Sequence, residues 1–411
     1  MMNQRPLPAY DIHPVSIKMI RKGHPWVLKD KFTEKFHPRD RFIVARDKRR
    51  PFALLIHDPT HKSVKARIWS ERGDFNKQIK NFKNDLNSRL RNAITKRVKA
   101  ELPKKRDNFY LVFGEGDQLP GLHIIYVKGK VLIQLYSFFW ENYKEYLMDL
   151  TLKNVRDTLN EDMTKADIWV QKRDDGEGLK TPATCIDPNK SYEVVEINEH
   201  GVTLKAYLGK FYDIGVYTDM ASVRDKIKSI YQGKKVLNLF AYSGAFSLAA
   251  LHEGASAVTS VDLSEEYLEL LEQNLKLNPE IDSAKHRSLC TSTQDFLKEA
   301  AASDEKYDFI ICDPPTSSSD GVTRVNALRE YKSLLPQMEG LLSENGKILV
   351  FLNSHRVSPK KFEGRLREVL EEGHSSLKIT KRFKLDQDCP MKKGFPEGSY
   401  LKGLLLEHDQ D

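Results

Sequence analysis

The sequence predicts an α/β fold whose main part is a doubly wound, mostly parallel sheet. Three apolar runs indicate it: VLNLF (236–240), VTSVD (258–262) and YDFIICD (307–313). Each run is typical of a buried parallel strand that ends in a residue able to face a ligand. In sheets of this kind, ligands bind outside the carboxyl ends of the strands. We therefore expect the functional site at the edge where these three runs end.

The loop after the first run limits the kind of ligand. AYSGA (241–245) contains one glycine, Gly244, and lacks the GxGxxG and GKS patterns that bind a dinucleotide pyrophosphate or a nucleoside triphosphate. A smaller adenosine compound is therefore favoured. Asp262 stands 24 residues after Asn238, the distance at which such folds place a carboxylate on the two hydroxyls of a ribose. The same aspartate also fits the N-terminal cap of a helix that begins near Ser264.

Asp-Pro-Pro at 313–315 ends the third run with a stiff turn that cannot continue the strand pairing. In this order and spacing, the loop, the acid and the turn resemble the binding loop, ribose acid and catalytic loop of class I S-adenosylmethionine-dependent methyltransferases. The resemblance implies a Rossmann-like catalytic domain with S-adenosylmethionine as cofactor. The alternative is an α/β core whose strands end in incidental acids.

Charge is distributed unevenly along the chain. The whole sequence carries +8, but residues 1–106 hold 28 Lys and Arg against 10 Asp and Glu, which is +18 and leaves −10 for the rest. A basic front joined to an acidic half indicates that the N-terminal part binds a phosphate backbone. A merely solvated lysine-rich surface is the alternative, because runs such as 96–105 are common on exposed helices.

Other features of the sequence exclude several classes of protein. No apolar run reaches 18 residues, and the N-terminus lacks the pattern of a secretory signal, so we expect a cytoplasmic protein without a membrane partner. The cysteines are scattered, with no CxxC or His-rich spacing, so neither a metal site nor a disulfide framework is expected. They are Cys185, Cys290, Cys312 and Cys389.

At 411 residues the chain is long for a single core. Short β-like runs over the first seventy residues indicate a small barrel. Within it, RKGHPWVLKDKF (21–32) and VKARIWS (64–70) resemble the PUA-type RNA-binding domain that opens one family of ribosomal RNA methyltransferases. The predicted domains are a PUA-like β-barrel over 1–72, a central α+β domain with a basic helical linker over 73–195, and the methyltransferase domain over 196–411.

Two further segments resemble the same family. GEGDQLPGL (114–122) resembles an element of its central domain. LDQDCPMKKGFPEGSYLKG (385–403) resembles its C-terminal hairpin, with Cys389 in place of a histidine. The resemblance thus covers nearly the whole chain, from about residue 15 to residue 407.

The resemblance assigns the cofactor to a set of residues. Tyr242, Ser243 and Gly244 would contact its methionine moiety, with a simple strand-to-helix turn as the alternative. The aspartate that holds adenine in this fold falls on Ser292, so adenine is left to Ser292, to backbone groups or to a shifted Asp295. The full cofactor-binding set is Asp219, Arg224, Phe240, Tyr242, Ser243, Gly244, Asp262, Leu263, Ser292 and Asp313.

The residues that follow the predicted strands indicate which atom of the base is methylated. Position 316 is Thr rather than the aromatic residue of amino-directed enzymes, so methylation of an exocyclic amine loses support. Methylation of cytosine C5 needs a thiolate that adds to the ring. Cytosine enzymes of this layout carry it in a Phe-Ser-Cys-Ser run, where this chain has FLNS (351–354). Cys312 and Cys389 remain as alternative nucleophiles.

The guanine-N7 branch is the closest resemblance, through DPPT (313–316), LREY (328–331) and FLNSHR (351–356). Glu330 and Tyr331 depart from its pattern. Guanine N7 has an in-plane lone pair and no proton, so the transfer requires alignment rather than a base or a nucleophile. Surface salt bridges are the alternative role for the arginines. The expected catalytic residues are Asp313, Pro314, Thr316, Asn353 and Arg329.

We therefore expect a ribosomal RNA base methyltransferase, with guanine N7 favoured over cytosine C5. Its expected partner is ribosomal RNA of the large subunit, free or in an assembly particle. A non-catalytic RNA-binding assembly factor is one alternative, and the intact Asp262 argues against it. A small-molecule methyltransferase is another, and it leaves the basic front unexplained. The sequence does not decide the target nucleotide, the subunit or the oligomeric state, and a homodimer is compatible with it.

Overall fold

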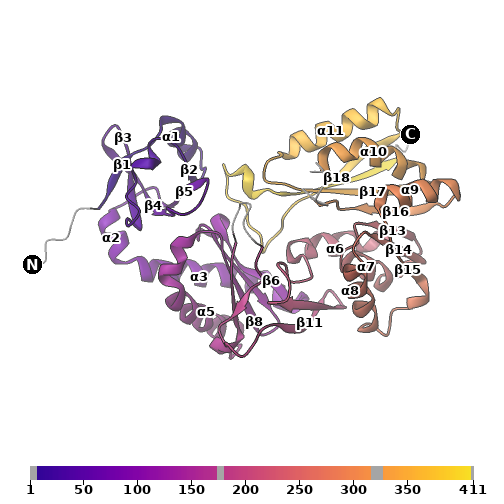
Figure 1. Ribbon diagram of the computed structural model, residues 1–411, viewed down its shortest axis with the longest axis horizontal. Coiled ribbons are helices and arrows are strands. Elements are labelled where there is room, and N and C mark those ends of the chain that lie inside the picture. The colour runs from indigo at the N-terminus through magenta and orange to yellow at the C-terminus, as the bar shows by residue number, and fades with distance from the viewer. Residues whose placement is uncertain (1–6, 174–179, 316–326, 409–411) are drawn as a thin grey trace, which may run out of the picture. The chain divides into compact units, whose positions relative to one another are not determined.

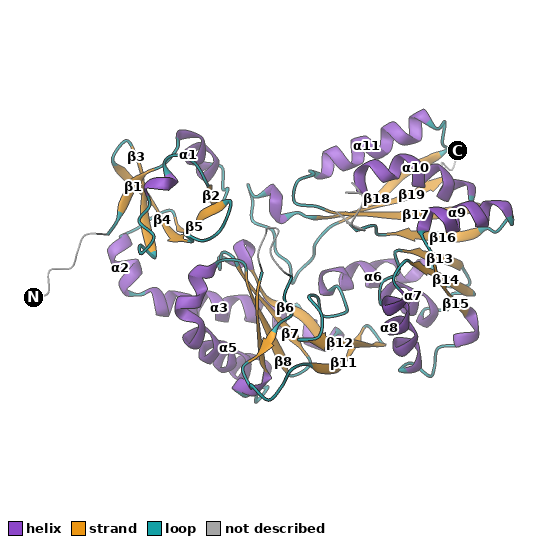
Figure 2. Cartoon of the chain, viewed as in Figure 1, coloured by secondary structure: helices purple, strands orange, loops and turns teal. Residues whose placement is uncertain are grey.

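The computed structural model describes residues 7–173, 180–315 and 327–408 (Figures 1 and 2). The chain forms two compact units. The first unit consists of residues 1–195, 206–214 and 387–398, and the second of residues 196–205, 215–386 and 399–411.

The first unit begins with a five-stranded sheet in the order β1-β3-β4-β5-β2, in which β1 is parallel to β3 and the other pairs are antiparallel. Its helix α1 starts with a proline and is capped by the His13 side chain, which accepts from the Val15 N–H. The elements are β1 (Ala9–Asp11), α1 (Pro14–Arg21), β2 (Trp26–Leu28), β3 (Phe42–Asp47), β4 (Arg50–His57) and β5 (Val64–Ser70).

A second sheet of the first unit has the order β10-β9-β8-β7-β6. Helices α3 and α5 pack against each other, and α3 also contacts β6. The basic segment that was expected to be helical consists of the three helices α2, α3 and α4. The elements are α2 (Phe75–Lys80), α3 (Phe82–Lys99), α4 (Leu102–Lys105), β6 (Asn108–Phe113), β7 (Leu122–Val127), β8 (Lys130–Leu135), α5 (Lys144–Leu159), β9 (Ile168–Lys172) and β10 (Thr184–Cys185).

One apolar core joins the two sheets of the first unit. Trp69 at the end of β5 lies with its ring centroid 4.8 Å from that of Phe82 on α3, and Phe82 lies 5.8 Å from Phe139. All three side chains are buried. Removing residues 7–70 would therefore expose part of a shared core, so substitutions are the better probe of this region.

A buried ion network also holds the first unit together. Arg97 binds both carboxylate oxygens of Asp117, at 2.7 and 2.6 Å, and donates to the Asp388 carbonyl oxygen at 2.7 Å. Arg106 pairs with the Asp388 carboxylate at 2.8 Å, which also accepts from the Tyr110 N–H at 3.1 Å. Segment 387–398 is thus an integral part of this unit, although it follows most of the second unit in the sequence.

The second unit contains a seven-stranded sheet in the order β15-β14-β13-β16-β17-β19-β18. The first five of these strands are parallel neighbours, and β19 is antiparallel to both β17 and β18. The predicted doubly wound, mostly parallel sheet is therefore confirmed. Its strands are β13 (Lys235–Leu239), β14 (Ala257–Asp262), β15 (His286–Cys290), β16 (Tyr307–Cys312), β17 (Leu342–Asn353), β18 (Leu377–Phe383) and β19 (Leu401–His408).

Helices cover both faces of this sheet (Figure 1). Alternate strand residues such as Leu237, Ile310 and Val350 pack with α9, α10 and α11 in one core. Phe351 faces the opposite side, where its ring lies 5.7 Å from that of Phe246 on α7. The helices are α6 (Ala221–Ile227), α7 (Ala245–His252), α8 (Glu265–Lys276), α9 (Thr293–Ala302), α10 (Ala327–Gly340) and α11 (Pro359–Glu372).

Two short strands, β11 (Glu193–Glu199) and β12 (Val202–Leu208), form a separate ladder through which the boundary between the units runs. Short 3-10 turns complete the chain: η1 (Thr33–Lys35), η2 (Gly114–Asp117), η3 (Phe138–Tyr143), η4 (Lys165–Asp167), η5 (Thr218–Met220), η6 (Lys228–Ile230), η7 (Ser283–Lys285) and η8 (Pro396–Gly398). In the described part of the chain, no helix has the length and apolarity that crossing a membrane requires.

Candidate functional site

Three strands of the second unit end level at one edge of its sheet. Leu239 of β13 stands in register with Val261 of β14 on one side and with Cys312 of β16 on the other. The strand order reverses between β13 and β16, which is where doubly wound sheets open a crevice for ligands. The residues that directly follow Leu239, Val261 and Cys312 are Phe240, Asp262 and Asp313.

The loop after β13 has a left-handed backbone at three positions. The φ angles are +58° at Phe240, +51° at Tyr242 and +81° at Gly244. Such angles are uncommon for residues with a side chain and persist only where the surroundings hold them. At Gly244 an added Cβ would lie 2.3 Å from Cγ of Leu271 on α8. Only glycine therefore fits at this position.

Hydrogen bonds fix the same loop from both sides. The buried Ser243 hydroxyl donates to the Gly215 carbonyl oxygen. The Asn274 side chain on α8 donates to the Ser243 carbonyl oxygen at 2.9 Å. The protein's own side chains thus hold the backbone of this loop in place.

Asp262 connects this loop to the start of α8. Its Oδ2 accepts from the Tyr242 N–H at 2.8 Å, and its Oδ1 accepts from the Ser264 N–H at 2.9 Å. Burial raises the pKa of the Asp262 carboxyl, and the backbone donors of Ser264, Tyr242 and Leu263 oppose that shift. The helix cap itself is Ser264, whose hydroxyl accepts from the Tyr267 N–H. A carboxylate accepts about four hydrogen bonds, so Asp262 keeps capacity for a further donor beside these backbone groups.

Asp313, at the end of β16, is joined to the end of β17. The Asn353 side-chain amide donates to Asp313 Oδ1 at 2.9 Å. Burial raises the pKa of the Asp313 carboxyl to about 7, and the negative charge of Asp219 adds to the rise, while Arg224 and the Asn353 hydrogen bond oppose it. Asp313 therefore changes its ionisation state near neutral pH, which an ordinary aspartate does not do.

The start of β19 contributes two polar side chains to this edge. The Tyr400 hydroxyl donates to Asp219 Oδ2. The buried Lys402 ammonium donates to the carbonyl oxygens of Ser354 and Tyr400, the latter at 2.7 Å. Burial lowers the pKa of Lys402 to about 8. Lys402 thus ties the segment that follows Asn353 to the neighbouring antiparallel strand.

Arg224 is engaged by the protein itself. Its guanidinium makes two hydrogen bonds to the Glu199 carboxylate, at 2.6 and 3.0 Å, and a third to the Tyr217 carbonyl oxygen at 3.0 Å. Both side chains of the Arg224–Glu199 pair are buried. This geometry makes Arg224 a residue that positions the Tyr217–Asp219 turn.

Three aromatic side chains lie beside the Asp262 end of the site. The Tyr242 ring lies 5.1 Å from that of Tyr217 and 4.6 Å from that of Tyr267, measured between centroids. Tyr217 and Tyr267 are exposed, as is Leu263, directly after Asp262. Exposed apolar surface at a strand end offers a stacking surface for a planar ring.

Ser292 lies at the N-terminus of α9. Its hydroxyl accepts from the Asp295 N–H at 3.1 Å and lies 2.6 Å from Asp295 Oδ2. Ser292 is therefore the helix cap, and the exposed Asp295 carboxylate lies against it. Thr291 extends β15 toward the site, because its N–H donates to the Asp262 carbonyl oxygen at 3.1 Å.

Pro314, Arg329 and Thr316 complete the predicted catalytic set. Pro314 is buried directly after Asp313, and Arg329 is exposed on the first turn of α10. Thr316 lies outside the described residues. Tyr331, also on α10, is fully buried: its hydroxyl lies 2.6 Å from the Phe351 carbonyl oxygen and 3.2 Å from that of Cys312, so it joins β16 to β17.

The thiols of the second unit are poorly placed for attack on a base. Cys312 is fully buried in the core with α9–α11, and burial raises the pKa of its thiol far above the ordinary value. Cys290 is exposed at the end of β15, with its sulfur 3.6 Å from the Leu263 carbonyl oxygen. It therefore lies toward Asp262 and not between Asp313 and Asn353.

Several of these residues are not found from the sequence. Glu199 carries no motif, and it stands 25 residues before its partner Arg224. Tyr400 and Lys402 lie in the PEGSYLKG run, whose mixture of aromatic and basic residues is the signal that could have marked them. Tyr217 lies in GVYTD (215–219), directly before the predicted Asp219.

Comparison with known proteins identifies the family to which this chain is similar. The sequence profile of a family described as S-adenosylmethionine-dependent methyltransferases matches residues 111–404. YwbD of Bacillus subtilis, a candidate ribosomal RNA large subunit methyltransferase, is 31% identical over 78% of this chain and 79% of its own length. Ribosomal RNA large subunit methyltransferase I of Erwinia tasmaniensis is 27% identical over 94% of this chain and 96% of its own.

Solved structures share the fold. The crystal structure of SMU.776, a candidate methyltransferase complexed with SAH, superposes with a TM-score of 0.82 at 20% identity, covering 97% of this chain and 100% of that one. A second structure, of a candidate SAM-dependent methyltransferase from Streptococcus mutans, gives a TM-score of 0.80 with the same coverage. The likeness therefore extends over both units of the chain.

Proposed function

The chain belongs to the S-adenosylmethionine-dependent methyltransferase family, and on this premise we propose that it methylates N7 of a guanine in large-subunit ribosomal RNA. The names of the relatives from Erwinia and Bacillus support the RNA substrate. So does the +18 charge of residues 1–106, since neutralising phosphates is the main source of affinity for RNA. Ribosomal RNA, free or in an assembly particle, is the proposed partner, and the cytoplasm the proposed location.

The residues of the loop after β13 fit the cofactor of this family. Asp262 retains acceptor capacity beside its backbone hydrogen bonds, so it is the proposed acceptor for the ribose hydroxyls. Tyr242, Ser243 and Gly244 are proposed to face the methionine moiety, where the fixed loop lets backbone groups approach closely. Leu263 and the neighbouring tyrosines would pack against adenine. When bound, the cofactor supplies a methyl group on a sulfonium.

The Asp313–Asn353 hydrogen bond is the observation that carries the choice of guanine N7. An amide stands where a cytosine enzyme needs a thiol, and it is held in place by a carboxylate. An N7 lone pair attacks a methyl carbon directly: the N–C bond forms as the S–C bond breaks, and no proton moves. Asn353 and Asp313 would then orient the base through its polar edge. Positive charge passes to the purine, and an ionised Asp313 stabilises it.

Cytosine C5 stays the second candidate because the relatives are named only by ribosomal subunit. It would need a thiolate at the base. The buried Cys312 and the position of Cys290 disfavour it in the second unit.

Nucleoside mapping tests the proposed function. Ribosomal RNA from cells with and without the protein is digested and analysed by mass spectrometry. We expect one 7-methylguanosine of the large-subunit RNA to disappear, and to return when the purified protein and S-adenosylmethionine are added. Loss of a 5-methylcytidine instead would transfer the assignment to cytosine, and an unchanged ribosomal RNA would refute the substrate.

A further inference from the structure

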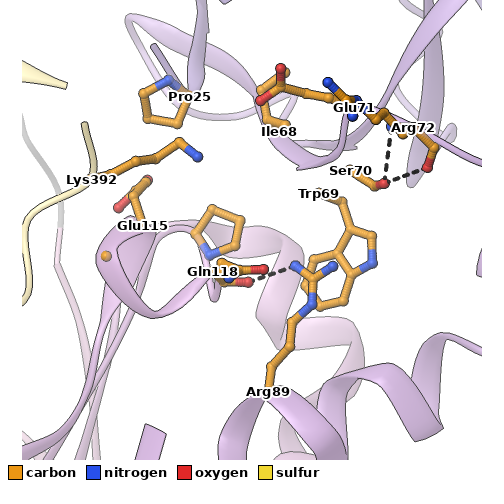
Figure 3. A pocket seen from close by; sticks show the side chains of 12 residues that line it. Pro25, Ile68, Trp69, Ser70, Glu71, Arg72, Arg89, Glu115, Gln118 and Lys392 are labelled. Atoms are coloured by element: carbon orange, nitrogen blue, oxygen red, sulfur yellow. Dashed lines mark hydrogen bonds between the residues drawn. The ribbon is translucent and has the colours of Figure 1, made fainter. Parts of the chain in front are cut away.

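The first unit contains a cavity of about 500 Å³ whose lining shares no residue with the candidate functional site (Figure 3). The end of β5, the turn η2 and helix α3 surround it, together with Lys392 from segment 387–398. Its volume lies within the usual range for small-molecule sites.

One wall of the cavity is a cationic plane that the protein holds in place. The Arg89 guanidinium lies 3.7 Å from the ring centre of the buried Trp69. It is fixed there by Asp85 at 3.0 Å and by a 2.7 Å hydrogen bond to the Gln118 carbonyl oxygen. Figure 3 shows Arg89 across Trp69 with this hydrogen bond drawn. Flat guanidinium groups are surfaces on which unpaired bases stack.

Two further cations line the same cavity. Within residues 7–173, 180–315 and 327–408, neither Arg72 nor Lys392 has an ion-pair partner. The Lys392 side chain extends into the hollow between Pro25 and Glu115 (Figure 3). Glu115 keeps a negative charge at this wall, because its nearest cation, Arg67 at 3.5 Å, also pairs with Asp58.

The balance of charge in the cavity therefore favours an anionic ligand. The lining carries three cations, Arg72, Arg89 and Lys392, against two carboxylates, Glu71 and Glu115. A planar stacking surface beside two available cations matches the two halves of a nucleotide, its base and its phosphate.

We propose that this cavity holds one nucleotide of a single-stranded segment of the RNA substrate, with its base on Arg89 and its phosphate at Arg72 and Lys392. The inference rests on the proposed function for the identity of the RNA. Residues 1–106 carry a net charge of +18, enough to bind the phosphates of several neighbouring nucleotides. This favours a nucleotide within an RNA chain over a free mononucleotide. The cavity would position the RNA without taking part in the chemistry.

Charge reversal in the full-length protein tests the phosphate contact. The variant Arg72→Glu/Lys392→Glu is compared with Lys96→Glu/Lys99→Glu, which makes the same charge change at exposed positions of α3 outside the cavity. We expect the first variant to lower affinity for a short single-stranded RNA by about tenfold and to flatten its salt dependence by about 0.7, the slope of one phosphate contact. The control should lose less. An equal loss of RNA affinity in both variants would mean that only the net charge of the protein matters, and would contradict a phosphate contact in the cavity.

Arg89→Lys tests the stacking contact, because lysine keeps the charge and loses the plane. We expect about a five- to tenfold loss of affinity with an unchanged salt slope. Photo-crosslinking of RNA that contains 4-thiouridine gives a direct readout: the crosslinked peptides should include residues 68–72 or 116–120. Crosslinks confined to other regions, or guanosine monophosphate competing as strongly as the RNA, would overturn the proposal.

These outcomes separate the cavity from the proposed function. An unchanged urea-unfolding curve for the whole protein confirms that the first unit of each variant is folded, and unchanged affinity for S-adenosylmethionine confirms the same for the second unit. If the wild type methylates ribosomal RNA and the cavity variants bind it normally, the cavity inference fails and the function stands. If the cavity variants lose RNA while the wild type leaves ribosomal RNA unmethylated, the function fails and the cavity inference stands. A wild type that binds no RNA refutes the cavity inference.

Discussion

The Tyr242 N–H donates a 2.8 Å hydrogen bond to Asp262 Oδ2, which joins the loop after β13 to the end of β14. One carboxylate therefore has two tasks. It holds a backbone with positive φ, and we propose that it receives the ribose hydroxyls.

Replacing Asp262 with Ala should remove both tasks. We expect S-adenosylmethionine affinity to fall by about 1.5–3 kcal/mol, the scale of a lost charge-assisted hydrogen bond. Asp262→Asn keeps an acceptor for the Tyr242 N–H and should lose less. Titration calorimetry on folded variants measures both, and an Asp262→Ala variant with wild-type affinity would take this residue out of the cofactor site.

The rate of methyl transfer should depend on pH through Asp313. Its pKa is raised to about 7, so its carboxyl is protonated below that pH and ionised above it. If the ionised form stabilises the charge on the purine, the single-turnover rate rises from pH 6 to pH 8 and then levels off. Asp313→Asn should be slower and should lose this rise. A flat wild-type profile would exclude a catalytic role for the ionised carboxylate.

Asn353 should matter through alignment. We expect Asn353→Ala to slow methyl transfer by about 100-fold, since a misplaced base loses its near-attack geometry. Cofactor affinity serves as the control and should stay unchanged. If the rate of Asn353→Ala lies within a few-fold of wild type, the base is oriented by other residues.

Serine substitutions at Cys290, Cys312 and Cys389 should leave methylation within about tenfold of wild type, because attack by an N7 lone pair uses no thiol. RNA containing 5-fluorocytosine provides a stricter test. A covalent adduct with the wild-type protein that one serine variant abolishes would restore the cytosine assignment.

The Arg224–Glu199 pair should be a stability element. Removing one partner leaves a buried charge alone, so Arg224→Met and Glu199→Leu should each lower the free energy of unfolding by about 3–5 kcal/mol. The double variant should lose less than the sum of the two. Urea unfolding of the four proteins gives the coupling energy, and strictly additive losses would mean that the two side chains act independently.

The sequence predicted the second unit's sheet because its strands are apolar runs of a length and order that few folds accommodate. The edge with Phe240, Asp262 and Asp313 followed from the rule that parallel strands end together. Membership of the methyltransferase family and the S-adenosylmethionine cofactor are confirmed by comparison. The roles of the individual site residues remain predictions.

Other features depend on distant pairings that no local pattern reveals. Tyr400 and Asp219 are 181 residues apart, and their hydrogen bond depends on β19 lying beside β17. Ser292, by contrast, caps α9 through a local hydrogen bond, and its contact with adenine stays a prediction. The ion pair of Arg224 could not be predicted either, because its partner Glu199 lies on the separate strand β11.

Asp388 belongs to the first unit but is synthesised late, so it determines when that unit can complete its folding. Arg97 reaches its carbonyl oxygen across 291 residues of sequence, and Arg106 and Tyr110 share its carboxylate. At the usual speed of translation, roughly 5–20 residues per second, the two arginines leave the ribosome about 15–60 s before this partner does. The strands β13–β17 are made during that wait. The part of the protein that is synthesised first is thus among the last to mature, and a ribosome that stalls before residue 388 leaves it incomplete.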